Sequence, residues 1–361
     1  MRPEPLPMTP TSRRQFLQTA IALGLLRPFG LFAAANPPIA PIADTHSHLG
    51  FFSRKLNGGS LKAMMEEAGV TLLAWSIVAD ARWIRRTSSG IDQWGTPGAP
   101  EQAAYFRERL AMARQYLEKD GLAYARGPED IDAARAGRPC VVIASEGAGF
   151  LEEDPALLDK LHADGLRHLQ LVHYIHNAIG DFQTRPPQHH GLTVFGERVI
   201  AACNRLGILV DLAHCESTVV ERALEVSTVP MIWSHSALMP VDYALKNPGR
   251  LSRLLRLDLA KKIAVKGGAV GLWALRASVR DSPEGYATEL MNMADAIGPE
   301  HVMFGTDIEG LGSFGVMDGL SDLRQVADVL RQRGVDDQAL GAICFDNYAR
   351  CLKVAMAARL A

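Results

Sequence analysis

The sequence predicts a (β/α)8 barrel of the TIM type, and three observations favour this fold class. Eight short apolar runs recur along the chain, amphipathic helical patterns separate most of them, and side chains that bind metals stand at the ends of most runs. Continuous apolar strands that alternate with helices indicate a parallel sheet covered on both faces. None of the runs resembles the short or charged edge strand of an open sheet. A closed barrel is therefore favoured.

The apolar runs and helical patterns follow one another in a regular order. The strands are expected at 39–43, 71–78, 140–144, 168–173, 207–214, 231–235, 269–273 and 301–307. Helices are expected near 101–119, 128–136, 193–206, 217–226, 250–262, 285–296, 319–333 and 346–357. The segment after the second strand is rich in glycine and proline up to Pro100, so an irregular connection is predicted there.

Length and composition set broad limits on function. The chain has 361 residues, 48% of them hydrophobic, which suits one large barrel with a well-filled core. The net charge is −2, and no basic cluster interleaved with aromatic residues is visible, so nucleic acid is not an expected partner. The five cysteines form no C-x-x-C pair and are typical of small buried side chains.

The first 35 residues have the three zones of an export signal. Arg13 and Arg14 form a twin-arginine pair, residues 19–26 are apolar, and residues 33–35 are Ala-Ala-Ala. We therefore predict a twin-arginine signal over 1–35, read by the twin-arginine export machinery, and one barrel domain over 36–361. Residues 1–35 carry a net charge of +3, so their removal changes the chain from −2 to −5. No other run reaches the roughly 18 apolar residues that span a bilayer. The mature protein is thus expected in the periplasm or secreted, without stable membrane insertion.

Three residues near the first and third strands form the first part of a predicted metal site. His46 and His48 are two apart at the end of the first strand, where alternate side chains share a face. Glu146 ends the third strand between apolar residues, and a carboxylate buried there needs a partner. The alternative for the histidines is a pair on the surface or a hydrogen-bonded pair in the core, and the alternative for Glu146 is an ion pair with a nearby Arg or Lys. The carboxyl ends of barrel strands favour metal ligation.

Later strands add further candidates at the same end of the barrel. His214 and His235 end consecutive strands, and neutral imidazole is a common ligand of zinc-like ions. Asp307 follows the eighth strand and is predicted to act as general base or to orient water, with a helix N-cap as the alternative. His173 follows the fourth strand and is predicted to contact the reacting group, with a hydrogen-bonded core histidine as the alternative.

These motifs resemble the renal (membrane) dipeptidase family of zinc peptidases over roughly 39–357. The resemblance rests on Ser145-Glu146-Gly147, Leu171-Val172-His173, Asp211-Leu212-Ala213-His214, Ser234-His235-Ser236, Gly305-Thr306-Asp307 and Asp346-Asn347. It implies a barrel with two zinc ions and a small peptide substrate, and it suggests a homodimer. One zinc would be held by the first-strand motif and Glu146, and the other by Glu146, His214 and His235. His173 would contact the substrate, and Asp307 would handle the proton.

Two positions depart from the family pattern. His48 stands where the family usually has Asp, so the site is less negative by one charge. Lys246 stands where the family often has an Arg that binds the substrate carboxylate, and Lys cannot form the same two-pronged contact.

The sequence as a whole predicts an exported zinc-dependent dipeptidase. Water made reactive by the metals would attack the scissile carbonyl, and Asp307 would pass a proton to the leaving amine. Two alternatives stay open: a barrel amidohydrolase that acts on another amide, lactone or ester, and a binding protein that has lost catalysis. A nuclease is disfavoured because it needs a basic groove for phosphates, and the mature chain is acidic.

Overall fold

Eight parallel strands form the centre of the computed structural model, which describes residues 40–359 except 54, 57, 88–89, 241–242 and 244–251. Their order is β1 (Ile42–Ser47), β2 (Val70–Val78), β6 (Cys140–Glu146), β7 (Leu166–Gln170), β8 (Leu209–Asp211), β9 (Ile232–Ser236), β10 (Ala269–Leu272) and β11 (Val302–Phe304). A parallel bridge between Ser47 and Ile308 joins the two ends of this sheet. The backbone N–H of Asp307 also donates to the carbonyl of His46 at 2.9 Å. The predicted (β/α)8 barrel is confirmed.

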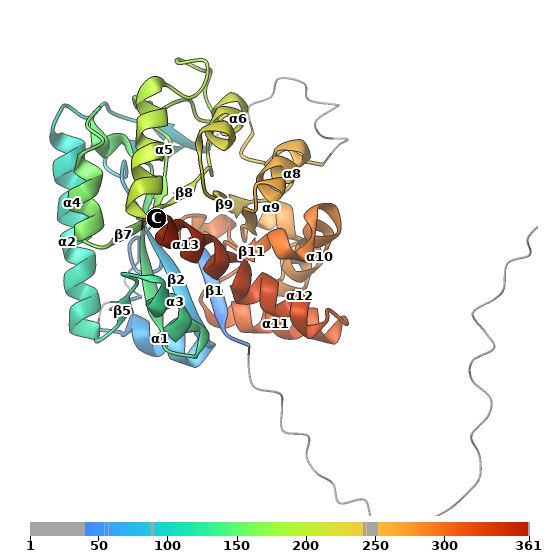
Figure 1. Cartoon of the computed structure of the whole chain (residues 1–361). Helices are drawn as coiled ribbons and strands as arrows, with labels where there is room; N and C mark the ends of the chain where they lie inside the picture. Colours follow the sequence, from blue (N-terminus) through green and yellow to red (C-terminus); the bar gives the residue numbers. More distant parts are fainter. Residues whose placement is uncertain are drawn as a thin grey trace, which may run out of the picture. The chain divides into compact units, whose positions relative to one another are not determined.

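Helices surround the strands, as Figure 1 shows. They are α1 (Leu61–Ala68), α2 (Glu101–Asp120), α3 (Pro128–Arg135), α4 (Leu157–Ala163), α5 (Val194–Leu206), α6 (Ser217–Val226), α8 (Leu257–Val265), α9 (Arg276–Val279), α10 (Pro283–Ile297), α11 (Ser321–Gln332), α12 (Asp337–Gly341) and α13 (Asn347–Ala358). Several helices begin or end at residues that cap the backbone. Ser60 and Thr193 accept hydrogen bonds from backbone N–H groups in the first turns of α1 and α5. Gly207 ends α5 in the left-handed conformation.

Several local predictions differ from the structure. The first strand, expected at 39–43, is β1 at Ile42–Ser47, and α1 and α4 were not expected. The segment after β2 is not wholly irregular, because it contains an antiparallel hairpin of β3 (Ile84–Thr87) and β4 (Gly90–Gln93). Its strands carry Arg and Asp side chains on short, partly exposed runs, so an apolar pattern does not reveal them. The helix predicted at 250–262 is α8, which begins seven residues later at Leu257 because Arg256 is still extended.

Close backbone packing fills the middle of the barrel. The Thr45 hydroxyl lies 2.8 Å from the carbonyl oxygens of both Ser234 and Phe304. A Cβ added at Gly271 or Gly305 would lie within 1.8 Å or 1.7 Å, respectively, of the Ser234 carbonyl oxygen. These two positions therefore require glycine so that the strands can approach one another. This packing brings the ends of β1, β9 and β11 together.

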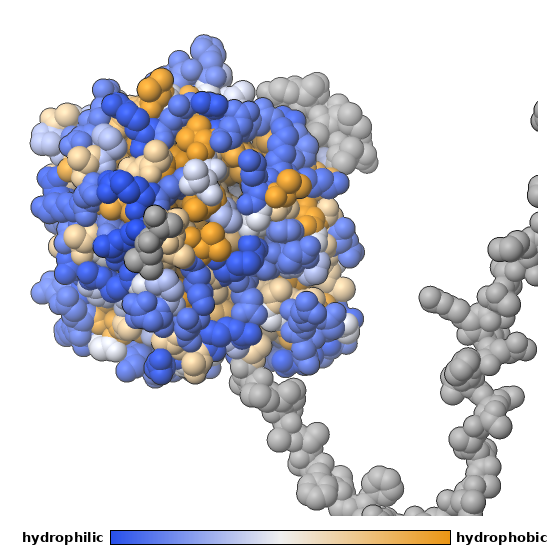
Figure 2. Space-filling model, viewed as in Figure 1, coloured by the Kyte–Doolittle hydropathy of each residue, from blue (hydrophilic) through white to orange (hydrophobic). Residues whose placement is uncertain are grey.

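The surface and the chain ends add three further facts. Residues 40–361 form one compact unit, and the predicted signal over 1–35 lies outside the described residues. Among the described helices, none is long and apolar enough to cross a bilayer. On the face shown in Figure 2, hydrophobic residues form separate spots among hydrophilic ones. Scattered apolar residues of this kind are normal on a protein surface.

Candidate metal centre

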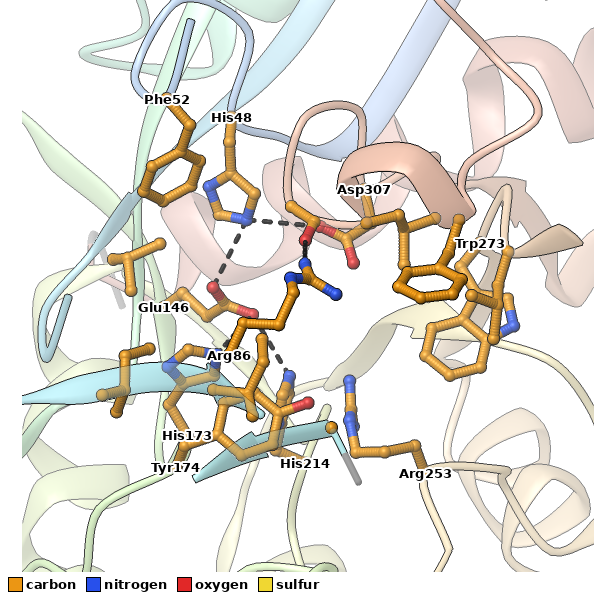
Figure 3. Close-up of a pocket in the computed structure, with 18 residues that line it drawn as sticks. His48, Phe52, Arg86, Glu146, His173, Tyr174, His214, Arg253, Trp273 and Asp307 are labelled. Carbon is orange, nitrogen blue, oxygen red and sulfur yellow. Dashed lines mark hydrogen bonds and ion pairs between the residues drawn. The ribbon is translucent and has the colours of Figure 1, made fainter. Parts of the chain in front are cut away.

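The carboxyl ends of the barrel strands bring the predicted site residues together. His46 lies in β1, Glu146 is the last residue of β6, and His235 lies in β9. The others follow their strands by one to three residues: His48 after β1, His173 after β7, His214 after β8 and Asp307 after β11. All seven side chains are buried. The fold therefore gathers residues that are up to about 260 positions apart in sequence, as Figure 3 shows for five of them.

Glu146 is at the centre of this cluster, since five imidazoles surround its carboxylate. The Nε2 atoms lie between 3.1 and 3.6 Å from the Glu146 oxygens: His214 at 3.1 Å, His48 and His173 at 3.3 Å, His46 at 3.5 Å and His235 at 3.6 Å. His48 faces Oε2, whereas the other four face Oε1. His46 therefore shares one carboxylate oxygen with His214 and His235, and His48 faces the other.

The imidazole spacing fits two divalent cations. Nε2 of His46 lies 3.0 Å from Nε2 of His48, and Nε2 of His214 lies 3.1 Å from Nε2 of His235. Tetrahedral zinc with Zn–N bonds of about 2.0–2.1 Å places ligand nitrogens about 3.3 Å apart. Donor groupings of His46, His48 and Asp307, and of Glu146, His214 and His235, each have ligand atoms within 4.8 Å of one another. The donors therefore fit divalent ions of the zinc type, and Glu146 is close enough to both histidine pairs that it could help to hold an ion at either.

Three histidines make hydrogen bonds through Nδ1, and these bonds leave their Nε2 atoms facing Glu146. Nδ1 of His48 donates to the Ser76 carbonyl at 2.7 Å, and Nδ1 of His46 lies 3.2 Å from the Ser76 hydroxyl. Nδ1 of His235 lies 2.8 Å from the Ser234 hydroxyl. Partners of this kind fix the tautomer and the ring plane of metal-binding histidines. The protein itself therefore holds these three rings, whereas Nδ1 of His214 has no hydrogen-bond partner in the described part of the chain.

The pKa of His48 is shifted in the opposite direction from the pKa values of His214 and His235. Burial lowers the pKa of His48, but Glu146 and Asp307 outweigh it and raise the pKa to about 10. Burial lowers the pKa of His214 well below the ordinary value, and Arg253 adds to this effect. The pKa of His235 is also lowered well below its usual range, by burial and then by His46. His214 and His235 are consequently neutral near pH 7, the form that binds metals.

His173 has a carboxylate partner that sequence reasoning missed. Its Nδ1 lies 2.6 Å from Oδ1 of Asp80, whose Oδ2 accepts from the backbone N–H of Tyr174 at 3.1 Å. Burial lowers the pKa of His173, but Asp80 and Glu146 outweigh it and raise the pKa to about 9. Asp80 follows β2 by two residues. Asp80 could have been identified from the sequence, because it is a polar residue that follows a buried strand.

Backbone conformation is unusual at two site residues. His214 has φ 69° and Asp307 has φ 56°, both in the left-handed region. Non-glycine residues seldom occupy this region and tend to do so at functional sites. At both positions the chain leaves a strand and turns the side chain into the cluster.

A cavity of about 270 Å³ opens above the cluster. Its walls include His48, Glu146, His173, His214 and Asp307, together with Tyr174, Trp273, Phe314 and two arginines, Arg86 and Arg253 (Figure 3). The Arg253 guanidinium contacts Nε2 of His235 at 3.0 Å and Gln183 Oε1 at 3.1 Å. The sequence pattern indicates neither arginine. It indicates Lys246 instead, which lies outside the described residues.

A family model matches most of the chain. The family model described as membrane dipeptidase (peptidase family M19) matches residues 57–360. The chain belongs to the membrane dipeptidase family. The match begins after β1, so the positions of His46 and His48 rest on the structure and not on the family match.

Individual relatives agree with the family. Dipeptidase verJ of Clonostachys rogersoniana is 28% identical over 67% of this chain and 61% of that protein. Dipeptidase 3 of Mus musculus is 29% identical over 59% of this chain and 44% of that protein. The matched regions thus span about half to three fifths of these curated relatives.

Solved structures show the same fold. A metallopeptidase from Rhodobacter sphaeroides, liganded with a phosphinate mimic of the dipeptide L-Ala-D-Ala, has a TM-score of 0.72 at 20% identity. The dipeptidase AC, a metallopeptidase of family M19, has a TM-score of 0.72 at 21% identity. Each comparison covers 88% of this chain and 99% of the other.

Proposed function

We propose that this protein is a zinc-dependent dipeptidase that hydrolyses the peptide bond of small dipeptides. One observation carries the proposal: five imidazole nitrogens lie within 3.6 Å of the Glu146 carboxylate, Asp307 lies beside His48, and a cavity opens onto this cluster. Family membership supports the reaction class. Two zinc ions are the proposed cofactors, one held by His46, His48 and Glu146, and one by Glu146, His214 and His235.

When bound, such a metal pair makes water acidic and polarises the scissile carbonyl. The protein's own residues handle position and protons. Asp307 Oδ1, which is buried and 3.4 Å from His48 Nε2, takes the proton of the attacking water and delivers it to the leaving amine. His173 is held by Asp80 with its Nε2 toward the centre, where it donates to the developing oxyanion.

Arg253 supplies the cation that a dipeptide needs at its C-terminal carboxylate. It lines the same cavity, and its Nε is buried without a hydrogen-bond partner in the described structure. A guanidinium can bind a carboxylate through two parallel hydrogen bonds. Lys246, in the same connection between β9 and α8, is proposed as a second contact for the substrate.

Kinetics on purified, zinc-loaded protein test this function. The panel contains L-L and L-D dipeptides, the N-acetylated forms of the same amino acids and a simple lactone. The proposal predicts hydrolysis of dipeptides, inhibition by a phosphinate dipeptide mimic and loss of activity in chelator. Turnover of the lactone alone would instead support the broader amidohydrolase alternative, and no turnover with two metals bound would reject both.

Residues 1–35 are proposed to direct export by the twin-arginine route, which would place the enzyme in the periplasm or outside the cell. Replacing Arg13 and Arg14 by Lys tests this directly. The unmodified chain should reach the periplasmic fraction, whereas the double variant should stay in the cytoplasm. A homodimer is proposed as well, and light scattering would measure it.

A further inference from the structure

The β3–β4 hairpin contributes one wall of the cavity above the cluster. Ile84, Arg86 and Ile91 line the cavity, and Arg86 lies opposite Ile91 in the hairpin register. Arg85 lies opposite Asp92 and stacks on Trp94, with its guanidinium carbon 3.5 Å from the ring centroid. Because side chains alternate along a strand, the hairpin directs one arginine toward the cavity and its neighbour away from it.

Arg86 is an available cation at the mouth of the cavity. Its Nη2 donates to the Gly310 carbonyl at 3.2 Å, and its guanidinium carbon lies 5.5 Å from the centroid of Phe314. Figure 3 shows the side chain reaching across the site toward Asp307. No ion pair joins Arg86 to a carboxylate anywhere in the part of the chain that the structure describes. The exposed guanidinium therefore keeps donors for an incoming anion.

The charges around the cavity leave this cation without an obvious internal partner. Among the described lining residues, the only carboxylates are Glu146 and Asp307, and both are engaged by His48. Arg253 also lines the cavity, and the proposed function assigns it to the C-terminal carboxylate. A neutral dipeptide offers one carboxylate to two arginines. A dipeptide with an acidic side chain offers two.

We propose that Arg86 is a specificity-determining residue that selects dipeptides carrying an acidic side chain. The side-chain carboxylate would bind the Arg86 guanidinium while the C-terminal carboxylate binds Arg253. This inference rests on the proposed dipeptidase function and adds the substrate class to it. It does not depend on the order in which the acidic and neutral residues occur in the dipeptide.

A purely structural role for Arg86 makes a different prediction. If its hydrogen bond to Gly310 only holds the hairpin over the cavity, removing it should reduce turnover of every dipeptide by the same factor. If Arg86 binds the side-chain carboxylate of the substrate, its removal should lower turnover of acidic dipeptides more than turnover of neutral ones. The ratio of kcat/KM between an acidic dipeptide and its neutral amide therefore separates the two roles.

The experiment compares Ala-Asp with Ala-Asn and Asp-Ala with Asn-Ala, so that each pair differs in charge and hardly in shape. Unmodified enzyme is expected to prefer at least one acidic member. In Arg86→Gln, the ratio of kcat/KM between the acidic dipeptide and its amide should fall about tenfold, the size expected for one charge-assisted hydrogen bond. Most of this change should come from a higher KM for the acidic dipeptide. Arg86→Lys should restore part of the ratio. Arg85→Gln, which changes the same charge one residue away on the other face, should leave the ratio unchanged.

Each outcome has a clear meaning. Equal rates on acidic and amide substrates, or an equal loss on both in Arg86→Gln, would overturn this inference while leaving the dipeptidase function standing. An unchanged preference in Arg86→Gln would overturn it too. Absence of dipeptide hydrolysis by the unmodified, metal-loaded enzyme would instead reject the proposed function itself. Metal content of all three arginine variants should equal that of the unmodified protein.

Discussion

Replacing Glu146 by Gln is expected to remove most of the affinity for metal while leaving the barrel folded. The change keeps the shape of the side chain but removes the one negative charge that five histidines share. A metal ion held beside Glu146 would lose the attraction of that charge, and a unit charge pair about 4 Å apart is worth about 4 kcal/mol with an effective dielectric constant of about 20. An ion loses roughly 10³-fold in affinity for a change of this size.

The assay measures zinc per chain by elemental analysis after equilibration at several buffered free zinc concentrations. Unmodified protein should bind two equivalents, and Glu146→Gln should bind fewer than one at the concentration that half-saturates the unmodified chain. Glu153→Gln is the matched control, because it removes an equal charge from an exposed position seven residues further on. Circular dichroism checks that both variants fold. Two equivalents bound by Glu146→Gln with unchanged affinity would refute the assignment of Glu146 as the bridge.

Three further predictions concern the substrate cation, the pH dependence of stability and the barrel interior. Arg253→Gln should raise KM for dipeptides by about tenfold or more while metal content is unchanged, and an equal KM would count against a contact with the substrate. His162 is buried beside Arg167, and burial followed by that guanidinium lowers its pKa from 6.5 to about 4. As the pH falls, the unfolded chain therefore binds a proton at His162 before the folded chain does. About 1–3 kcal/mol of folding stability should be lost between pH 6.5 and pH 4. Urea unfolding should show a smaller loss over that range for His162→Asn. Gly305→Ala should yield little folded protein, because the added Cβ would lie 1.7 Å from the Ser234 carbonyl oxygen. A normal thermal melting curve for Gly305→Ala would contradict the packing described for the barrel centre.

The sequence predicted the barrel and the cluster for a physical reason. Parallel strands buried on both faces leave long apolar runs, and a polar residue such as Glu146 or His235 at the end of such a run is conspicuous. Because all strands of the barrel end on one rim, residues marked in this way must lie near one another. The structure brings together all the site residues predicted within its described part.

Other parts of the site could not be predicted in this way. Arg86 and Arg253 lie on a short hairpin and on a connection, where no repeating pattern shows which side chain points inward. Asp80 was overlooked because its function depends on the position of His173, 93 residues away. Side-chain direction in connections depends on tertiary packing, so the residues that bind substrate are harder to identify than those that bind metal.

Crystals of the metal-loaded protein would test the central claim most directly, through anomalous diffraction at the zinc absorption edge. We predict two peaks about 3.5–4 Å apart, one beside His46 and His48 and one beside His214 and His235, with the Glu146 carboxylate between them. A single peak, or peaks that Glu146 does not contact, would contradict the two-metal centre on which the proposed hydrolysis depends.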